Sequence, residues 1–104
     1  GIMSSRIMYE RVVCKSGFSM SVQAHAGGYC SPRENGAERY AAVEVGFPSE
    51  QEPMLMEFAE EPDHPTETVY GYVPVLIVTN VIVKHGGMVE GSAPPGVIQL
   101  WCDE

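Results

Sequence analysis

The stretch F-S-M-S-V-Q-A-H, residues 18–25, decides the fold because its apolar and polar side chains alternate. The apolar members that share one face are Phe18, Met20, Val22 and Ala24. A period of two is typical of a β-strand with one buried face. The preceding segment, I-M-Y-E-R-V-V-C at residues 7–14, is rich in β-branched and aromatic side chains and predicts another strand. The turn-like K-S-G at residues 15–17 separates the two, so we expect an antiparallel hairpin.

Three later segments also predict strands. Residues 40–47, Y-A-A-V-E-V-G-F, alternate in the same way, and the side chains expected to share the inner face are Ala41, Val43, Val45 and Phe47. Residues 68–73 form the fourth strand, in which Tyr70 and Tyr72 share a face. We expect both rings to pack in the core; the alternative is that the face is exposed and contacts a partner. Residues 97–101 form the last strand.

A helix is expected after Pro48. Ser49-Glu50-Gln51-Glu52 has the form of a capping box, in which a hydroxyl and a carboxylate three residues later satisfy the first backbone amides. The alternative is that Glu52 caps the helix and Pro53 is its first residue. The apolar stripe of Leu55, Phe58 and Ala59 has helical spacing, and the helix is expected to end near Glu61-Pro62.

Residues 74–85 carry conflicting signals. Their many β-branched side chains favour a strand, whereas Pro74 at the start and Gly86-Gly87 after the end favour a helix. The polar residues Thr79, Asn80 and Lys84 also gather on one side of a helical wheel. We therefore predict a helix.

The expected order is β-β-β-α-β-α-β in a single domain over residues 1–104. This is an α+β fold with a mainly antiparallel sheet of about five strands and two helices. A chain of 104 residues, 44% of them apolar, is long enough to bury a core without metal or disulfides. The longest nearly apolar stretch, residues 73–83, is too short for a membrane span, which needs about 18 residues or more.

The charge distribution is strongly asymmetric. The formal net charge is −8, which argues against direct binding of nucleic acid because that needs a basic face. Between Tyr40 and Val83 there is no Lys or Arg, and the carboxylates there are Glu44, Glu50, Glu52, Glu57, Glu60, Glu61, Asp63 and Glu67. Such a surface either only improves solubility or attracts a basic partner.

We therefore take six carboxylates as candidate binding residues. They are Glu50, Glu52, Glu57, Glu60, Glu61 and Asp63. The partner they predict is a basic protein surface or a nucleic-acid-binding protein, with the carboxylates imitating phosphates. The expected protein is thus a non-enzymatic binding protein, in its sharpest form an inhibitor of a nucleic-acid-handling complex.

The irregular segment from Gly27 to Gly36 supports an alternative, a small enzyme or ligand-binding protein. His25 and Cys30 are its candidate catalytic residues, and Arg33 and Tyr29 its candidate binding residues. The cysteines and histidines lack the close spacings of structural zinc sites, so we expect neither a metal nor a cofactor. The odd number of cysteines, three, favours reduced thiols inside a cell.

Three short segments carry a resemblance to a known group of proteins. They are V-E-V-G-F-P-S-E at 43–50, T-V-Y-G-Y-V-P at 68–74 and K-H-G-G at 84–87. In these the chain resembles small uncharacterised proteins encoded by tailed phages and related mobile elements. The resemblance implies a cytoplasmic accessory protein made in a bacterial host, and it transfers no catalytic residue.

Overall fold

The computed structural model describes residues 6–103, and in that range the chain forms five strands, a 3-10 helix and an α-helix. The strands are β1 (Val12–Cys14), β2 (Ser19–Gln23), β3 (Ala42–Gly46), β4 (Val69–Pro74) and β5 (Met88–Glu90). The helices are η1 (Pro53–Phe58) and α1 (Val75–Lys84). The predicted α+β class, with a mainly antiparallel sheet and two helical segments, is confirmed.

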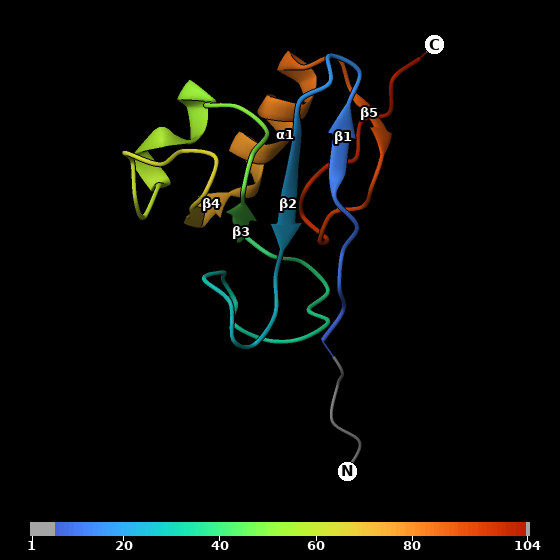
Figure 1. Cartoon of the computed structure of the whole chain (residues 1–104). Helices are drawn as coiled ribbons and strands as arrows, with labels where there is room; N and C mark the ends of the chain where they lie inside the picture. The colour runs from blue at the N-terminus through green and yellow to red at the C-terminus, as the bar shows by residue number, and fades with distance from the viewer. Residues whose placement is uncertain (1–5, 104) are drawn as a thin grey trace.

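The strands form one sheet in the order β4-β3-β2-β1-β5, in which every neighbouring pair is antiparallel. The predicted hairpin is present, since Val12 pairs with Met20 across β1 and β2. On the other side of β2, Val22 pairs with Val45 of β3. The alternating residues of 18–25 therefore lie at the centre of the sheet, as their pattern predicted (Figure 1).

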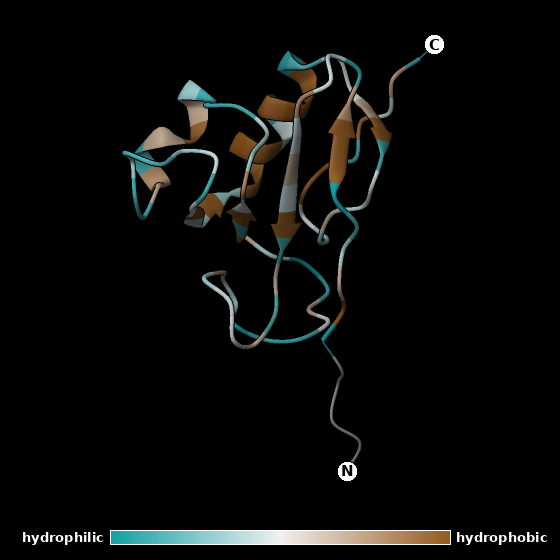
Figure 2. Ribbon diagram, viewed as in Figure 1, coloured by the Kyte–Doolittle hydropathy of each residue, from teal (hydrophilic) through white to brown (hydrophobic). Residues whose placement is uncertain are grey.

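One face of the sheet is covered by α1, and η1 packs beside β4 (Figure 1). Val12, Met20, Val22 and Val45 are fully buried beneath the helix layer, together with Ile82 of α1. The brown, apolar segments of the strands and of α1 in Figure 2 follow this layer. The opposite face carries Ser19 and Ser21 of β2, which are partly exposed.

The glycines after α1 end the helix as expected. Gly86 and Gly87 have φ angles of +91° and +90°, and their amides donate to the carbonyls of Val83 and Ile82. This is a Schellman motif, which satisfies the last carbonyls of a helix. The helix-boundary signals, Pro74 before the segment and Gly86-Gly87 after it, thus outweighed the β-branched content of residues 74–85.

The first helix differs from the capping-box expectation. Glu52 is the N-cap, its Oε2 accepts from the amide of Met54 at 2.8 Å, and Pro53 is the first helical residue. Ser49 turns instead to the sheet, where its hydroxyl accepts from the Ser19 amide at 2.9 Å. The helix ends at Phe58, because the Glu60 amide donates to the Val69 carbonyl and the chain joins the edge of β4.

The last predicted strand is misplaced. Residues 97–101 contribute only an isolated parallel bridge, between Trp101 and Met88, whereas the fifth strand is Met88–Glu90. The amide of Ile98 bonds to the Thr79 hydroxyl instead of to a strand. Three residues between two glycines are too short to show a period, so β5 had no signal in the sequence.

Candidate functional site

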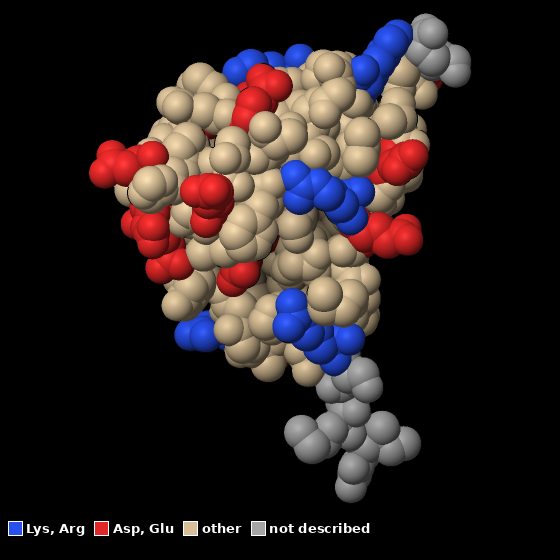
Figure 3. Space-filling view, viewed as in Figure 1, with Lys and Arg blue, Asp and Glu red and all other residues tan. Residues whose placement is uncertain are grey.

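The acidic residues on and after η1 form an exposed surface. Glu50 and Glu57 are exposed, as are Glu60, Glu61 and Asp63 in the following loop. Figure 3 shows acidic side chains gathered on this side of the molecule, the left of the view, over η1 and the segment that leads to β4. Five of the six carboxylates proposed as binding residues are therefore accessible to a partner.

Glu52 is the exception, and its assignment to the acidic surface is wrong. Its side chain is 2% exposed, and its two oxygens bind the Lys84 ammonium at 2.9 Å and His85 Nε2 at 2.7 Å. Burial by itself would raise the pKa of Glu52, but the hydrogen bonds from Met54, His85 and Lys84 outweigh it and lower the pKa below the ordinary value. Glu52 is thus an internal anion that joins the start of η1 to the end of α1.

His85 continues this network toward the β1–β2 turn. Its Nδ1 lies 3.0 Å from the Ser16 hydroxyl, and its ring stacks on Phe18 with centroids 4.2 Å apart. A serine, a histidine and a carboxylate in series resemble a nucleophilic triad. The Ser16 hydroxyl, however, also accepts from the Phe18 amide, and the Ser16 amide donates to the His85 carbonyl. These bonds fasten the hairpin turn to the helix end, which makes the chain of contacts structural.

A first hollow lies within the acidic surface. It has a volume of about 440 Å³, and its lining residues are Phe47, Glu60, Glu61, Glu67, Thr68 and Val69. The Phe47 ring is half exposed, and three carboxylates surround it. Acidic and aromatic groups therefore meet in one concave area.

A second hollow shares Glu60 with the first. Its volume is about 280 Å³, and its other lining residues are Tyr29, Phe58, Gly71 and Tyr72. The rings of Tyr29 and Tyr72 lie 6.1 Å apart between centroids and are tilted by 42°. A side chain at Gly71 would crowd Tyr29. The glycine therefore leaves room for the hollow between the two tyrosine rings. We call the two hollows together the acidic-aromatic surface.

Two aromatic residues of this surface have strained backbones. Phe47 and Tyr72 have φ angles of +49° and +53°, and they are the only residues other than glycine with positive φ between positions 6 and 103. For side chains of this size that conformation costs about 1–3 kcal/mol, and such strain concentrates at functional sites. The strain therefore marks the same surface as the charges do.

The surrounding structure holds both residues in place. The Arg11 guanidinium donates to the Phe47 carbonyl at 2.6 Å, and the Phe47 amide donates to Thr68. Tyr72 belongs to a bulge in β4, where the register against β3 shifts, and its amide donates to the Tyr29 carbonyl. The expected inward positions of Phe47 and Tyr72 are thus wrong. Tyr72 lies in the bulge, which turns its side chain to the other face, and Phe47 follows the last residue of β3 in a left-handed conformation that ends the alternation.

No functional role was expected for Phe47 from the sequence, and for Tyr72 a contact with a partner was only the alternative to a place in the core. Both directly follow a glycine near or within a strand, Gly46 before Phe47 and Gly71 before Tyr72. An isolated glycine in a strand pattern indicates a bulge or a close backbone approach. That signal was available, but it does not say which neighbour takes the left-handed conformation.

At the loop from Gly27 to Gly36, the two candidate catalytic residues do not form a nucleophilic pair. Cys30 is fully buried, and its sulfur donates to the backbone carbonyls of His25 and Pro32. The His25 imidazole turns away onto the glycines, where Nδ1 accepts from the Gly27 amide at 3.1 Å. Arg33 lies over the Tyr29 ring, with Cζ 5.9 Å from its centroid. A buried thiol without a basic partner does not support nucleophilic catalysis.

In residues 6–103, no group of three or more His, Cys, Asp or Glu side chains is arranged to hold a metal ion. No helix in that range has the length and apolar character needed to cross a membrane. The three cysteines are free thiols.

Comparisons of the chain with protein-family models, with curated proteins and with solved structures find no match. Function is therefore inferred from the geometry of this chain itself.

Proposed function

We propose that this protein is a non-enzymatic binding protein whose acidic-aromatic surface engages the lysine and arginine side chains of a basic protein. The observation that supports this most directly is the coincidence of three features at one place. Two hollows share Glu60, carboxylates line them, and each contains one of the two left-handed aromatic residues.

The chemistry of the surface suits a long cationic side chain. The aliphatic stem of a lysine or arginine packs against an aromatic ring, while its charge lies over the ring face or beside a carboxylate. Arg33 already places its guanidinium over Tyr29, so this ring accepts a cation within the chain itself. Glu60 and Glu61 supply the opposite charge in the adjoining hollow.

Longer-range electrostatics favour the same partner. The acidic run between Tyr40 and Val83 contains no basic residue, so its field attracts positive surfaces from a distance and repels nucleic acid. Interactions of this kind increase the association rate more than the final affinity. A basic surface that normally contacts nucleic-acid phosphates fits this field, and its occupation would inhibit the partner.

The resemblance to small phage-encoded proteins and the three free thiols support a cytoplasmic setting in a bacterial host. A phage accessory protein in that setting meets many basic, nucleic-acid-handling proteins. We therefore propose a host or phage protein of this class as the partner.

A labelled peptide of arginine, lysine and glycine tests the proposal, with binding followed by fluorescence polarisation. The informative variant is E57K/E60K/E61K, whose three positions are exposed. The matched control is E34K/E38K/D103K, which makes the same charge change at exposed positions elsewhere. Both variants should fold like the wild type, because exposed substitutions usually cost less than about 0.5 kcal/mol each.

The proposal expects the peptide to bind the wild type and the control variant and to lose binding to E57K/E60K/E61K. Equal weakening by the two variants would show that only net charge matters. In that case the acidic run would serve solubility, and the proposed function would be wrong.

A further inference from the structure

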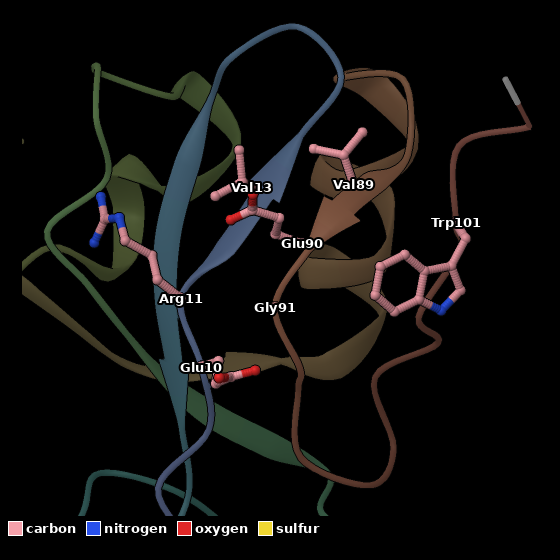
Figure 4. Close-up of a pocket in the computed structure, with 7 residues that line it drawn as sticks. All are labelled: Glu10, Arg11, Val13, Val89, Glu90, Gly91 and Trp101. Carbon is pink, nitrogen blue, oxygen red and sulfur yellow. The ribbon is translucent and has the colours of Figure 1, made fainter.

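A third hollow lies at the β5 edge of the sheet, whereas the acidic-aromatic surface lies at the β4 edge. It is formed by β1, β5 and the C-terminal segment (Figure 4). Its volume is about 610 Å³. Trp101 forms one wall, Val13 and Val89 provide apolar surface, and Glu10 and Glu90 provide two carboxylates. Neither the sequence patterns nor the proposed function accounts for this arrangement.

Backbone pairing brings the two carboxylates to the same hollow. Gly91 has a φ of +106°, and a Cβ there would collide with the Arg11 carbonyl, so only glycine allows this approach to β1. The next residue, Ser92, exchanges two hydrogen bonds with Glu10, one through its amide and one through its hydroxyl. The backbone of Glu10, two residues before β1, is thereby fixed beside the end of β5, where Glu90 lies.

Trp101 is fixed at the edge of the sheet although its ring is 53% exposed. The Met88 amide donates to the Leu100 carbonyl, and the Cys102 amide donates to the Met88 carbonyl. These two bonds, of 2.8 and 2.9 Å, hold the backbone on both sides of Trp101. An ordered, half-exposed indole is a strong site for a cation because its ring face is electron-rich.

Arg11 also lines the hollow, but its guanidinium does not bind the two carboxylates. The Arg11 guanidinium donates to the Ser19 hydroxyl at 3.0 Å and to the Phe47 carbonyl at 2.6 Å. Figure 4 shows it turned to the side away from Trp101. Within residues 6–103, neither Glu10 nor Glu90 uses its carboxylate in a hydrogen bond or ion pair. The hollow therefore presents a net negative charge beside an aromatic face.

We propose that this hollow binds a small alkylammonium ion, with the methyl groups against Trp101, Val13 and Val89 and the charge between Glu10 and Glu90. The apolar wall favours a methylated ammonium over a hydrated metal ion. The water molecules bound to a metal ion would face the two valines, with which they cannot form hydrogen bonds. The carboxylates disfavour a phosphate-bearing headgroup, so the ligand is a free ion rather than a phospholipid. The site is independent of the acidic-aromatic surface.

The experiment titrates choline into the full-length protein, with 3,3-dimethyl-1-butanol as its neutral counterpart of the same shape. Trp101 is the only tryptophan of the chain, so intrinsic fluorescence reports on this hollow without a label. The indole N–H signal in a ¹⁵N-resolved NMR spectrum provides a second readout. We expect a dissociation constant of about 1–10 mM for choline, because the hollow is open and its contacts are few.

Two variants with the same charge change separate the site from general electrostatics. E10Q/E90Q removes the charges of the hollow, and E34Q/E38Q removes two exposed charges elsewhere. We expect E10Q/E90Q to weaken choline binding about tenfold or more, since a tenfold change corresponds to the loss of one or two modest charge contacts. E34Q/E38Q and E57K/E60K/E61K should bind choline about as well as the wild type.

Vesicles of phosphatidylcholine, a lipid with a choline headgroup, provide the last part of the test. Phosphatidylcholine vesicles should leave the Trp101 emission unchanged if the ligand is a free ion. The proposal is overturned if choline causes no saturable change in either readout. It is equally overturned if the neutral alcohol binds as well as choline, if E10Q/E90Q binds choline normally, or if only the vesicles give a response.

Discussion

Oε1 of Glu52 lies 2.7 Å from Nε2 of His85, although 33 residues separate the two along the chain. Lys84 binds the other oxygen of the same carboxylate at 2.9 Å. The contact joins the N-terminus of η1, which leads to the acidic-aromatic surface, to the C-terminus of α1, which covers the sheet. Glu52 thus contributes to the position of the proposed binding surface without being part of it.

Replacing Glu52 should destabilise the protein strongly. E52A removes the N-cap of η1 and the charge-assisted hydrogen bonds to His85 and Lys84, and we expect a loss of about 2–4 kcal/mol. Urea unfolding followed by circular dichroism measures the free energy of unfolding. E50A, at an exposed neighbour, is the control and should change that energy by less than about 0.5 kcal/mol. Equal effects of the two substitutions would mean that the network is not stabilising.

The same carboxylate predicts a loss of stability in acid. Its pKa in the folded protein lies below the ordinary value of 4.5, so ionised Glu52 stabilises the fold above that value. The contribution disappears as the pH falls through the lowered pKa, because the folded state must then take up a proton. The difference in unfolding free energy between wild type and E52Q should therefore shrink as the pH falls below about 5 and through the lowered pKa. A difference that grows as the pH falls below about 5 would contradict the lowered pKa.

The two glycines after α1 should differ in how much stability is lost when each is replaced by alanine. G86A should cost about 1 kcal/mol, because alanine is disfavoured in the left-handed conformation. G87A should cost more, since its Cβ would lie 2.9 Å from the backbone nitrogen of Cys102, whereas at Gly86 the nearest atom belongs to the flexible Lys15 side chain. Thermal or urea unfolding of both variants checks the order, and a milder effect at Gly87 would argue against the close approach.

The strained aromatic residues predict a reversal of the usual ranking of glycine and alanine. At most positions a glycine variant of a protein is less stable than the alanine variant. At position 47 the order should reverse: because φ is positive there, the free energy of unfolding of F47G should exceed that of F47A by about 1 kcal/mol. The same order holds for Y72G and Y72A. All four variants should lose affinity for the basic peptide, since the ring is gone. The ordinary ranking, with alanine more stable, would show that the left-handed backbone is not maintained in solution.

The parts of the fold that the sequence predicted depend on local patterns. The alternation of residues 18–25 predicted the central strand, and the Gly86-Gly87 pair predicted the end of α1, because each signal acts within a few residues. The exposure of Glu57, Glu60 and Glu61 also followed from the buried position of Leu55. Contacts across long sequence separations were not predictable in this way. Glu52 is buried against residues 84 and 85, which bind its carboxylate. No local sequence pattern predicts this long-range contact.

The aromatic part of the candidate site was missed for a different reason. An alternating pattern assigns every second residue to the same face, and it fails wherever a bulge adds a residue. Tyr70 is fully buried, as the pattern predicts, but the bulge at Gly71 leaves Tyr72 exposed. The local sequence pattern and the backbone therefore disagree at the proposed binding surface, where Phe47 and Tyr72 have strained, left-handed backbones.

The proposed binding surface is tested most directly by titrating ¹⁵N-labelled protein with the arginine- and lysine-containing peptide and following backbone amide shifts. The account predicts saturable changes clustered at Phe47, Glu60, Thr68 and Tyr72. They should weaken as added salt shortens the Debye length, which is about 8 Å at physiological ionic strength. The signals of α1 and of the Trp101 indole should stay in place. Shifts spread evenly over all acidic positions, or clustered away from the two hollows, would contradict a binding role for the acidic-aromatic surface.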